Sequence, residues 1–398
     1  MTDHPIANFP YVAASVAVQP SEPAPHVALP GPCLEALPDN LRIGLTAPKL
    51  PGLDGLRAIC AALVVLSHLG VPRVSGSMGV LAFFVLSGFL ITWLLLAEEA
   101  RSGTVSLSAF YMRRTLRIFP AFYVYWIIAV GLAALLAARG GKPVDIGQAG
   151  ATLLYVSNYW QAIFGDSGTV LSHAWSLAVE EQFYLLWPWV FLRLPAARRL
   201  TTIIALIAIV IVHRAIITLV VREPEWAYAA FDCRADHLLV GCGLAVALWQ
   251  GRASGVWRWL CVGPARMALV TAVLVLSSQG TFFIPHYRNL VGFVLDPLLV
   301  AALIVQAIAS PGWRGTAWLH HRWLGTLGGW SYSTYLYQQL AAGVAHRMVF
   351  LPLPLRLVAG IVLTYGAAAL SHRWVERPFL RLKKRWERPR GPQLDGGL

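Results

Sequence analysis

Residues 53–70 read LDGLRAICAALVVLSHLG, an apolar run that carries Arg57 near its start and His68 near its end. Eleven residues at about 100° each make roughly three helical turns plus 20°, so both side chains project from one helix face, about 16 Å apart along the axis. Ionisable groups inside a membrane are costly and are usually functional. The pair therefore predicts a polar path through a helix bundle, with chemistry at each end.

The composition indicates the same class of protein along the rest of the chain. Of the 398 residues, 57% are hydrophobic and 13% are charged, against about 25% charged in soluble domains. Apolar runs of the roughly 20 residues that span a bilayer recur, and no alternating barrel pattern is present. We expect an all-α polytopic membrane protein of about ten transmembrane helices. The expected spans are 54–71, 78–97, 118–138, 176–194, 200–220, 234–250, 267–284, 290–309, 326–347 and 355–375.

The basic residues set the expected orientation. A net charge of +13 is compatible with a nucleic-acid partner, but the Lys and Arg residues gather in alternate short loops and in the C-terminal tail, as the positive-inside rule requires. We therefore expect both termini in the cytoplasm, the Arg57 end of the first span inside, and His68 near the outer surface. The prediction is a multi-pass protein of the inner cell membrane, in contact with lipids and not with nucleic acid.

Three domains are expected. Residues 1–50 hold nine prolines without a spanning run or a signal-peptide pattern, and predict a disordered cytoplasmic leader. Residues 51–382 form the transmembrane domain, and 383–398 a basic cytoplasmic tail. Segment 149–163 is short and polar in its middle, which favours an interfacial or re-entrant piece over a full span. The five cysteines lack metal or redox spacing, so no metal site is predicted.

Two basic groups are candidates for chemistry. His68 titrates near neutral pH and suits a general base, although a lone histidine also serves as a hydrogen-bonded packing residue. Arg57 has the alternative role of an anchor that extends to the headgroups. Arg114 and Arg117, in FYMRRTLRIFP at 110–120, share a helix face at the expected start of the third span, where free N–H groups favour phosphate. A positive-inside anchor explains these two arginines equally well.

The segment SHAWSLAVEEQFYLLWP at 172–188 carries acidic and aromatic candidates. Glu180 and Tyr184 are four residues apart on one face, with His173 and Trp175 close in sequence. The carboxylate suits the orientation of a histidine or the binding of a sugar hydroxyl. The alternatives are stabilisation of a helix N-terminus and an aromatic belt.

Two further segments give weaker signals. In FDCRADHLLVGCGLA at 231–245, Arg234 and Asp236 bind a ligand or pair with each other. In FFVLSGFLI at 83–91, Ser87 and Gly88 favour close helix packing.

Seven segments in order resemble acyltransferase family three over about 51–382. They are LDGLRAICAALVVLSH, FFVLSGFLITWLL, FYMRRTLRIFP, WSLAVEEQFYLLWP, RADHLLVGCGLA, GGWSYSTYLYQ and VERPF. The resemblance implies transfer of an acyl group, usually acetyl, from cytoplasmic acyl-CoA as co-substrate, with no permanently bound cofactor, to a hydroxyl that is often on an outward-facing sugar. The family's Arg-(ten residues)-His motif maps onto Arg57 and His68, its Arg-x-x-Arg motif onto Arg114 and Arg117, and its conserved Glu onto Glu180.

One position departs from that pattern. Many relatives carry His after SYSTYLY, whereas this chain has Gln338, for which we expect a positioning role through hydrogen bonds. The resemblance includes no appended esterase-like domain, so the bundle is expected to complete the transfer alone.

These observations combine into one mechanistic hypothesis. His68 acts as general base, and Glu180 orients it or the acceptor. Arg114 and Arg117 hold the CoA phosphates, while Arg57 lines the entry of the pantetheine arm. The residues expected on the acceptor side, for a glycan or lipid-linked saccharide, are His173, Trp175, Tyr184, Arg234 and Gln338. The runner-up function is a transporter or flippase of a lipid-linked glycan, and a non-catalytic membrane sensor ranks last.

Overall fold

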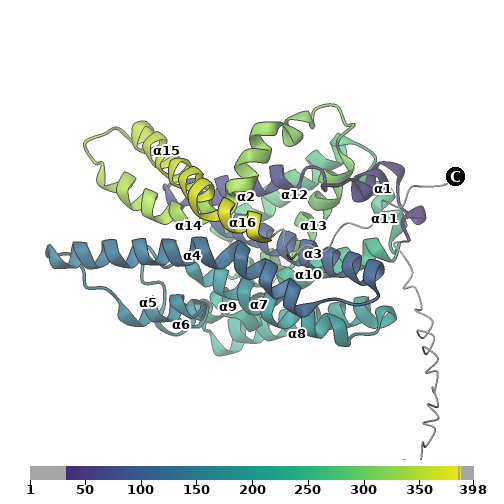
Figure 1. Ribbon diagram of the computed structural model, residues 1–398, viewed down its shortest axis with the longest axis horizontal. Helices are drawn as coiled ribbons and strands as arrows, with labels where there is room; N and C mark the ends of the chain where they lie inside the picture. The colour runs from purple at the N-terminus through teal and green to yellow at the C-terminus, as the bar shows by residue number, and fades with distance from the viewer. Residues whose placement is uncertain (1–32, 384–385, 387–398) are drawn as a thin grey trace, which may run out of the picture.

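The computed structural model describes residues 33–383 and 386, and every regular element in that part of the chain is a helix (Figure 1). The helices that match the expected spans are α2 (Leu53–His68), α3 (Gly76–Ser102), α4 (Leu107–Ala138), α7 (Ala174–Arg193), α8 (Arg199–Ile216), α10 (Phe231–Trp249), α12 (Pro264–Phe283), α13 (Phe293–Ala309), α14 (Arg322–Arg347) and α15 (Leu353–Ser371). Shorter helices connect them: α1 (Asp39–Thr46), α5 (Ile146–Leu153), α6 (Ser157–Phe164), α9 (Pro224–Ala229), α11 (Ser254–Leu260) and α16 (Arg377–Lys383). The prediction of an all-helical chain is confirmed.

Six helical segments of the described chain are long and apolar enough to cross a membrane. They are Gly76–Ser102, Leu107–Ala138, Ala196–Val221, Pro264–Phe283, Arg288–Ala309 and Leu353–Lys383. The other four expected spans coincide with α2, α7, α10 and α14, which are shorter or more polar. The count of ten spans therefore stays a prediction, and so does the cytoplasmic placement of both termini.

The centre of the bundle is the contact between α3 and α10, with α8 and α13 packed beside them. Glycines allow the two helices to approach closely. A Cβ at Gly88 would lie 1.9 Å from the carbonyl oxygen of Leu238, and one at Gly241 would lie 2.0 Å from that of Val85. No larger residue fits without moving backbone, so the packing role expected for Gly88 is confirmed. A second group, in which α14 packs on α2 and α15, adjoins this centre.

Residues before the expected boundary at residue 51 pack against the bundle. The 3-10 turn η1 (Leu34–Ala36) and α1 bury Leu34, Leu41 and Leu45 in the main hydrophobic core. The amide of Cys33 donates to the carbonyl of Trp249 at 2.9 Å. Residues 33–50 thus pack against the folded domain, because η1 and α1 each bury leucines that the proline count did not reveal. Residues 1–32 of the predicted leader, and residues 384–385 and 387–398 of the predicted tail, lie outside the described residues.

Segment 149–163 forms two short helices and not one long one. Helices α5 and α6 have eight residues each, about 12 Å of helix, which is too short to span a bilayer. Between them Tyr155 has a φ of 55°. The side-chain amide of Gln182 on α7 donates to the Tyr155 carbonyl at 2.9 Å and fixes this break against the bundle.

Candidate functional site

Helix α2 carries Arg57 and His68 without a break between them, so the predicted separation of about 16 Å along one axis holds. Arg57 is partly buried, and its Nη1 lies 3.8 Å from Oδ1 of Asp54. Asp54 also pairs with Lys49. The basic end of α2 is thereby held in a local charge network.

The ring of His68 has a defined protonation pattern. Its Nδ1 lies 2.8 Å from the carbonyl oxygen of Val64 in the preceding turn. A carbonyl oxygen only accepts, so in the neutral ring Nδ1 carries the proton and Nε2 has the free lone pair. This tautomer is the one that a general base needs.

Three charged or titratable side chains lie within electrostatic range of His68. Asp166, from the loop between α6 and α7, and His346, near the end of α14, are close enough for their charges to act on it. His173, directly before α7, is within the same range. The His173 ring is buried between the rings of Tyr125 and Tyr335, at centroid distances of 5.6 and 5.4 Å. The structure therefore brings together His68 and His173, two of the predicted residues.

Glu180 belongs to a different group, in which its Oε1 accepts hydrogen bonds from the hydroxyls of Ser87 on α3 and Tyr184 on α7. The contact four residues along α7 confirms that Glu180 and Tyr184 share a face. The guanidinium of Arg114 lies 4.4 Å from the ring centroid of Tyr184. Glu180 is thus linked through Tyr184 to Arg114, while its hydrogen bonds go to neither His68 nor His173.

Arg57, Arg114 and Arg117 form one group of positive charges, which we call the arginine cluster. The charges of Arg57 and Arg114 both act on Arg117. Glu376, at the end of the π-helical turn η6 (His372–Glu376), and Tyr184 lie within the same range. Arg57 and Arg114, which are 57 residues apart in sequence, therefore both lie within electrostatic range of Arg117.

The structure corrects two expectations about helix ends. Helix α4 begins at Leu107, where the Ser106 hydroxyl caps it by accepting from the Ala109 amide. Arg114 and Arg117 therefore lie well inside the helix, and only its first four residues have free N–H groups. The prediction that these arginines sit at a helix N-terminus is wrong. Helix α7 begins at Ala174, so stabilisation of a helix N-terminus by Glu180 is wrong for the same reason.

Arg234 lies in a box of aromatic rings. Its guanidinium is 3.9 Å from the ring centroid of Phe293 and 5.5 Å from those of Trp175 and Tyr228. The predicted residues Arg234 and Trp175 are thus in contact. The alternative that Arg234 pairs with Asp236 is wrong, because Oδ2 of Asp236 lies 2.7 Å from Nη1 of Arg214.

Gln338 is buried on α14, and within the described chain neither its amide nitrogen nor its amide oxygen has a hydrogen-bond partner. Its predicted positioning role stays a prediction.

The sequence reasoning missed Asp166 and Tyr228. Asp166 stands in the polar loop GDSGT and Tyr228 in the short helix α9, and only the tertiary fold brings them near His68 and Arg234.

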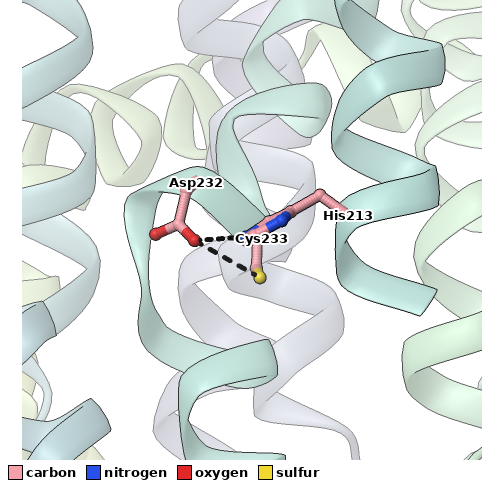
Figure 2. A group of neighbouring side chains, drawn as sticks. All are labelled: His213, Asp232 and Cys233. Atoms are coloured by element: carbon pink, nitrogen blue, oxygen red, sulfur yellow. Dashed lines mark hydrogen bonds and ion pairs between the residues drawn. The ribbon is translucent and has the colours of Figure 1, made fainter. Parts of the chain in front are cut away.

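A separate group of possible metal ligands lies at the start of α10. Figure 2 shows His213 of α8 directed toward Asp232 and Cys233, with one ligand atom from each within 4.8 Å of the others. Oδ2 of Asp232 is engaged by Nε2 of His213 at 2.6 Å and by the indole N–H of Trp226 at 3.0 Å. These contacts already satisfy that oxygen, so the group is explained as a hydrogen-bonded His–Asp pair.

Comparison with known proteins gives consistent results. A family model described as an acyltransferase domain matches residues 50–373. The putative peptidoglycan O-acetyltransferase YrhL of Bacillus subtilis is 29% identical over 363 residues, which are 83% of this chain and 54% of that protein. The peptidoglycan O-acetyltransferase OatA of Listeria monocytogenes is 30% identical over 83% of this chain and 55% of its own. The O-acetyltransferase OatA of Staphylococcus aureus is 32% identical over 83% and 57%.

The chain spans just over half the length of these curated relatives. No solved structure matches the fold significantly.

Proposed function

The chain belongs to the acyltransferase domain family whose model covers residues 50–373, and from this premise we propose that it is a membrane O-acyltransferase. It moves an acyl group, acetyl in the first instance, from acyl-CoA to a hydroxyl of a glycan. The named activities of its relatives support acetyl as the acyl group and a glycan as the acceptor. The protein acts as a multi-pass protein of the inner membrane.

The arginine cluster is the proposed site for the phosphates of acyl-CoA. Arg57, Arg114 and Arg117 place three cations near one another with Glu376 as the nearby carboxylate. Guanidinium groups bind phosphate oxygens with paired N–H donors. Because like charges repel, such a cluster is more favourable with an anion bound, and CoA supplies several phosphate charges.

The observation that carries the proposal is the contact between Nδ1 of His68 and the Val64 carbonyl, which leaves Nε2 as the base. Nε2 takes the proton of the acceptor hydroxyl as the hydroxyl oxygen bonds to the thioester carbon. The tetrahedral intermediate then collapses, the C–S bond breaks, and the CoA thiolate takes the proton from the imidazolium. The products are an O-acyl ester and free CoA.

Glu180 has a positioning role in this scheme. Its carboxylate accepts from Ser87 and Tyr184, and the Tyr184 ring stacks against Arg114. This arrangement supports a role on the donor side, where Glu180 holds Arg114 toward the phosphates. We propose this role in place of the expectation that Glu180 orients His68 or the acceptor.

The proposed topology has ten spans and both termini in the cytoplasm. The helices α2, α10 and α14, which are not among the six most apolar candidates, pack against other helices of the bundle. Polar residues on such helices face protein and not lipid, which is compatible with a membrane position. In this topology the arginine cluster lies at the cytoplasmic face and His68 lies toward the outer face, so the acyl arm crosses along α2.

The test is acetyl transfer by the full chain reconstituted in lipid, with labelled acetyl-CoA and peptidoglycan fragments. We expect transfer by the wild type and a kcat lower by about 10²- to 10⁴-fold for His68→Ala, the usual contribution of a general base. His213→Ala, which removes a histidine outside the proposed site, serves as the matched control and should retain activity.

Two results would contradict the proposal. Normal turnover by a His68→Ala protein that inserts at the wild-type level would exclude His68 as the base. Movement of a lipid-linked glycan across the bilayer without consumption of acetyl-CoA would instead identify a transporter.

A further inference from the structure

Two arginines of the bundle, Arg214 and Arg234, are completely buried near one another. Arg214 and Arg234 are both 0% exposed, and they share a single buried carboxylate, Asp236. Arg214 engages one oxygen of that carboxylate: its Nη1 donates to Oδ2 of Asp236, and the side chain also donates to the carbonyls of Asn289 at 3.0 Å and Cys233 at 2.8 Å. Arg214 is therefore a hydrogen-bonded structural residue, whereas within the described chain Arg234 has no hydrogen bond to a carboxylate.

Arg234 is buried without hydrogen-bond acceptors. Within the described chain none of its three guanidinium nitrogens has a hydrogen-bond partner. Aromatic rings surround the group, Phe293 at 3.9 Å and Phe84 at 5.7 Å among them. Ring faces attract a cation, but they leave the five N–H donors of a guanidinium unpaired. Asp236 acts on Arg234 electrostatically but not through a hydrogen bond, and buried donors without acceptors are strongly unfavourable, so the box suits an anion that accepts from them.

Arg288 adds a second cation at the edge of this box. It lies in the π-helical turn η4 (Arg288–Gly292), half-buried, with its guanidinium 4.5 Å from the ring centroid of Tyr228. The guanidinium of Arg234 lies 5.5 Å from the centroid of the same Tyr228 ring. The other carboxylates near Tyr228 are Glu225 and Asp166, which are less buried than Asp236. Arg288 is half-buried, whereas Arg234 is completely buried, so the two cations lie at different depths beside the Tyr228 ring.

The box and His68 have neighbours in common. Trp175, one wall of the box, is two residues from His173, whose charge interacts with that of His68. Asp166 is within range of both His68 and Tyr228. An acceptor held by its anionic group at Arg234 would have to extend past these shared neighbours to present a hydroxyl to the base.

We propose that Arg234 and Arg288 bind an anionic group of the acceptor, so that the acceptor is an acidic saccharide that carries a carboxylate or a phosphate. The inference rests on the proposed function for the identity of the acceptor, but binding of the anion does not require turnover. Acidic saccharides bind more tightly than their neutral counterparts, because only the acidic forms satisfy the buried guanidinium.

The experiment measures equilibrium binding to the full chain in lipid nanodiscs, alongside acetyl transfer. The carboxylate probe is the disaccharide of N-acetylglucosamine and N-acetylmuramic acid, compared with its methyl amide, which has the same size and no charge. The phosphate probe is N-acetylglucosamine 1-phosphate, compared with N-acetylglucosamine. We expect at least one acidic probe to bind about 10- to 100-fold more tightly than its neutral partner, as a charge-assisted contact provides.

Variants locate the effect. Arg288→Gln is preferred to a change of the buried Arg234, because a half-buried side chain is less needed for folding. It should weaken binding of the favoured acidic probe about tenfold and leave the neutral probe unchanged. Arg222→Gln, which removes an exposed arginine before α9, is the matched control and should change neither.

The outcomes separate the two proposals. Equal affinity of both acidic probes and their neutral partners, or equal weakening of acidic and neutral probes by Arg288→Gln, overturns the inference even if acetyl transfer proceeds. Selective binding of an acidic probe without acetyl transfer supports the inference and rejects the proposed function.

Discussion

Replacement of Gly88 by alanine tests the packing of the bundle centre. The added Cβ would lie 1.9 Å from the Leu238 carbonyl oxygen, about 1.5 Å inside ordinary contact distance. The obstacle is backbone of α10, which cannot rotate away as a side chain can. Overpacking of this kind typically costs about 1–3 kcal/mol, and a backbone clash belongs at the upper end.

Gly131→Ala is the matched control, because it places the same methyl group in the middle of α4 with no atom within 4 Å. Both variants gain about 1 kcal/mol of helix propensity, so the difference between them isolates the packing effect. We expect Gly88→Ala to be less stable than Gly131→Ala by about 2–3 kcal/mol, most of the overpacking cost.

The assay follows thermal unfolding by reaction of a thiol-specific dye. Cys60, Cys233, Cys242 and Cys261 are buried, whereas Cys33 is exposed and gives a constant background. The thiol of Cys242 contacts the Gly88 carbonyl at 3.5 Å, so the signal reports directly on the α3–α10 contact. Equal unfolding midpoints for the two variants would refute the close approach of these helices.

Two further predictions concern the donor side and pH. Tyr184→Phe keeps the ring that stacks on Arg114 but removes the hydrogen bond to Glu180. Tyr184→Leu also loses a cation–π contact of about 0.5–2 kcal/mol, so it should raise the KM for acetyl-CoA more than Tyr184→Phe does. Equal KM values for the two variants would contradict the stacking role. Burial lowers the pKa of His320 below its ordinary 6.5, so the folded state binds fewer protons than the unfolded state and stability declines as the pH falls through about 6.5. His320→Gln should reduce that decline between pH 7.5 and 5.5, and an unchanged slope would contradict it.

Local spacing was enough to predict contacts within one helix. Arg57 and His68 lie on one unbroken helix, and Glu180 meets Tyr184 one turn away, because the period of the α-helix alone fixes both relations. The ends of the helices were harder to predict from the sequence. Helix α4 begins at Leu107, eleven residues before the expected span, because Ser106 caps an amphiphilic extension that hydropathy does not detect.

Contacts between helices lay beyond the sequence. Asp236 pairs with Arg214 on α8 and not with its neighbour Arg234, since the crossing of α8 and α10 decides which arginine the carboxylate reaches. In the same way, the folding of residues 34–46 onto the core depends on a surface that only the assembled bundle provides. The preference for an anion that we propose at Arg234 arises because Asp236 pairs with Arg214 and leaves Arg234 without a hydrogen-bonded carboxylate.

The continuity of α2 has a mechanical consequence. Arg57 and His68 lie on one continuous helix, so any tilt of that helix would move both residues together. A tilt of 10° about the midpoint between them would displace each end by about 1.4 Å, in opposite directions, from the 16 Å separation. Binding of the donor near Arg57 would then shift His68 without any relay of side chains. By thermodynamic reciprocity, the acceptor would change the affinity for the donor by the same factor as the donor changes the affinity for the acceptor.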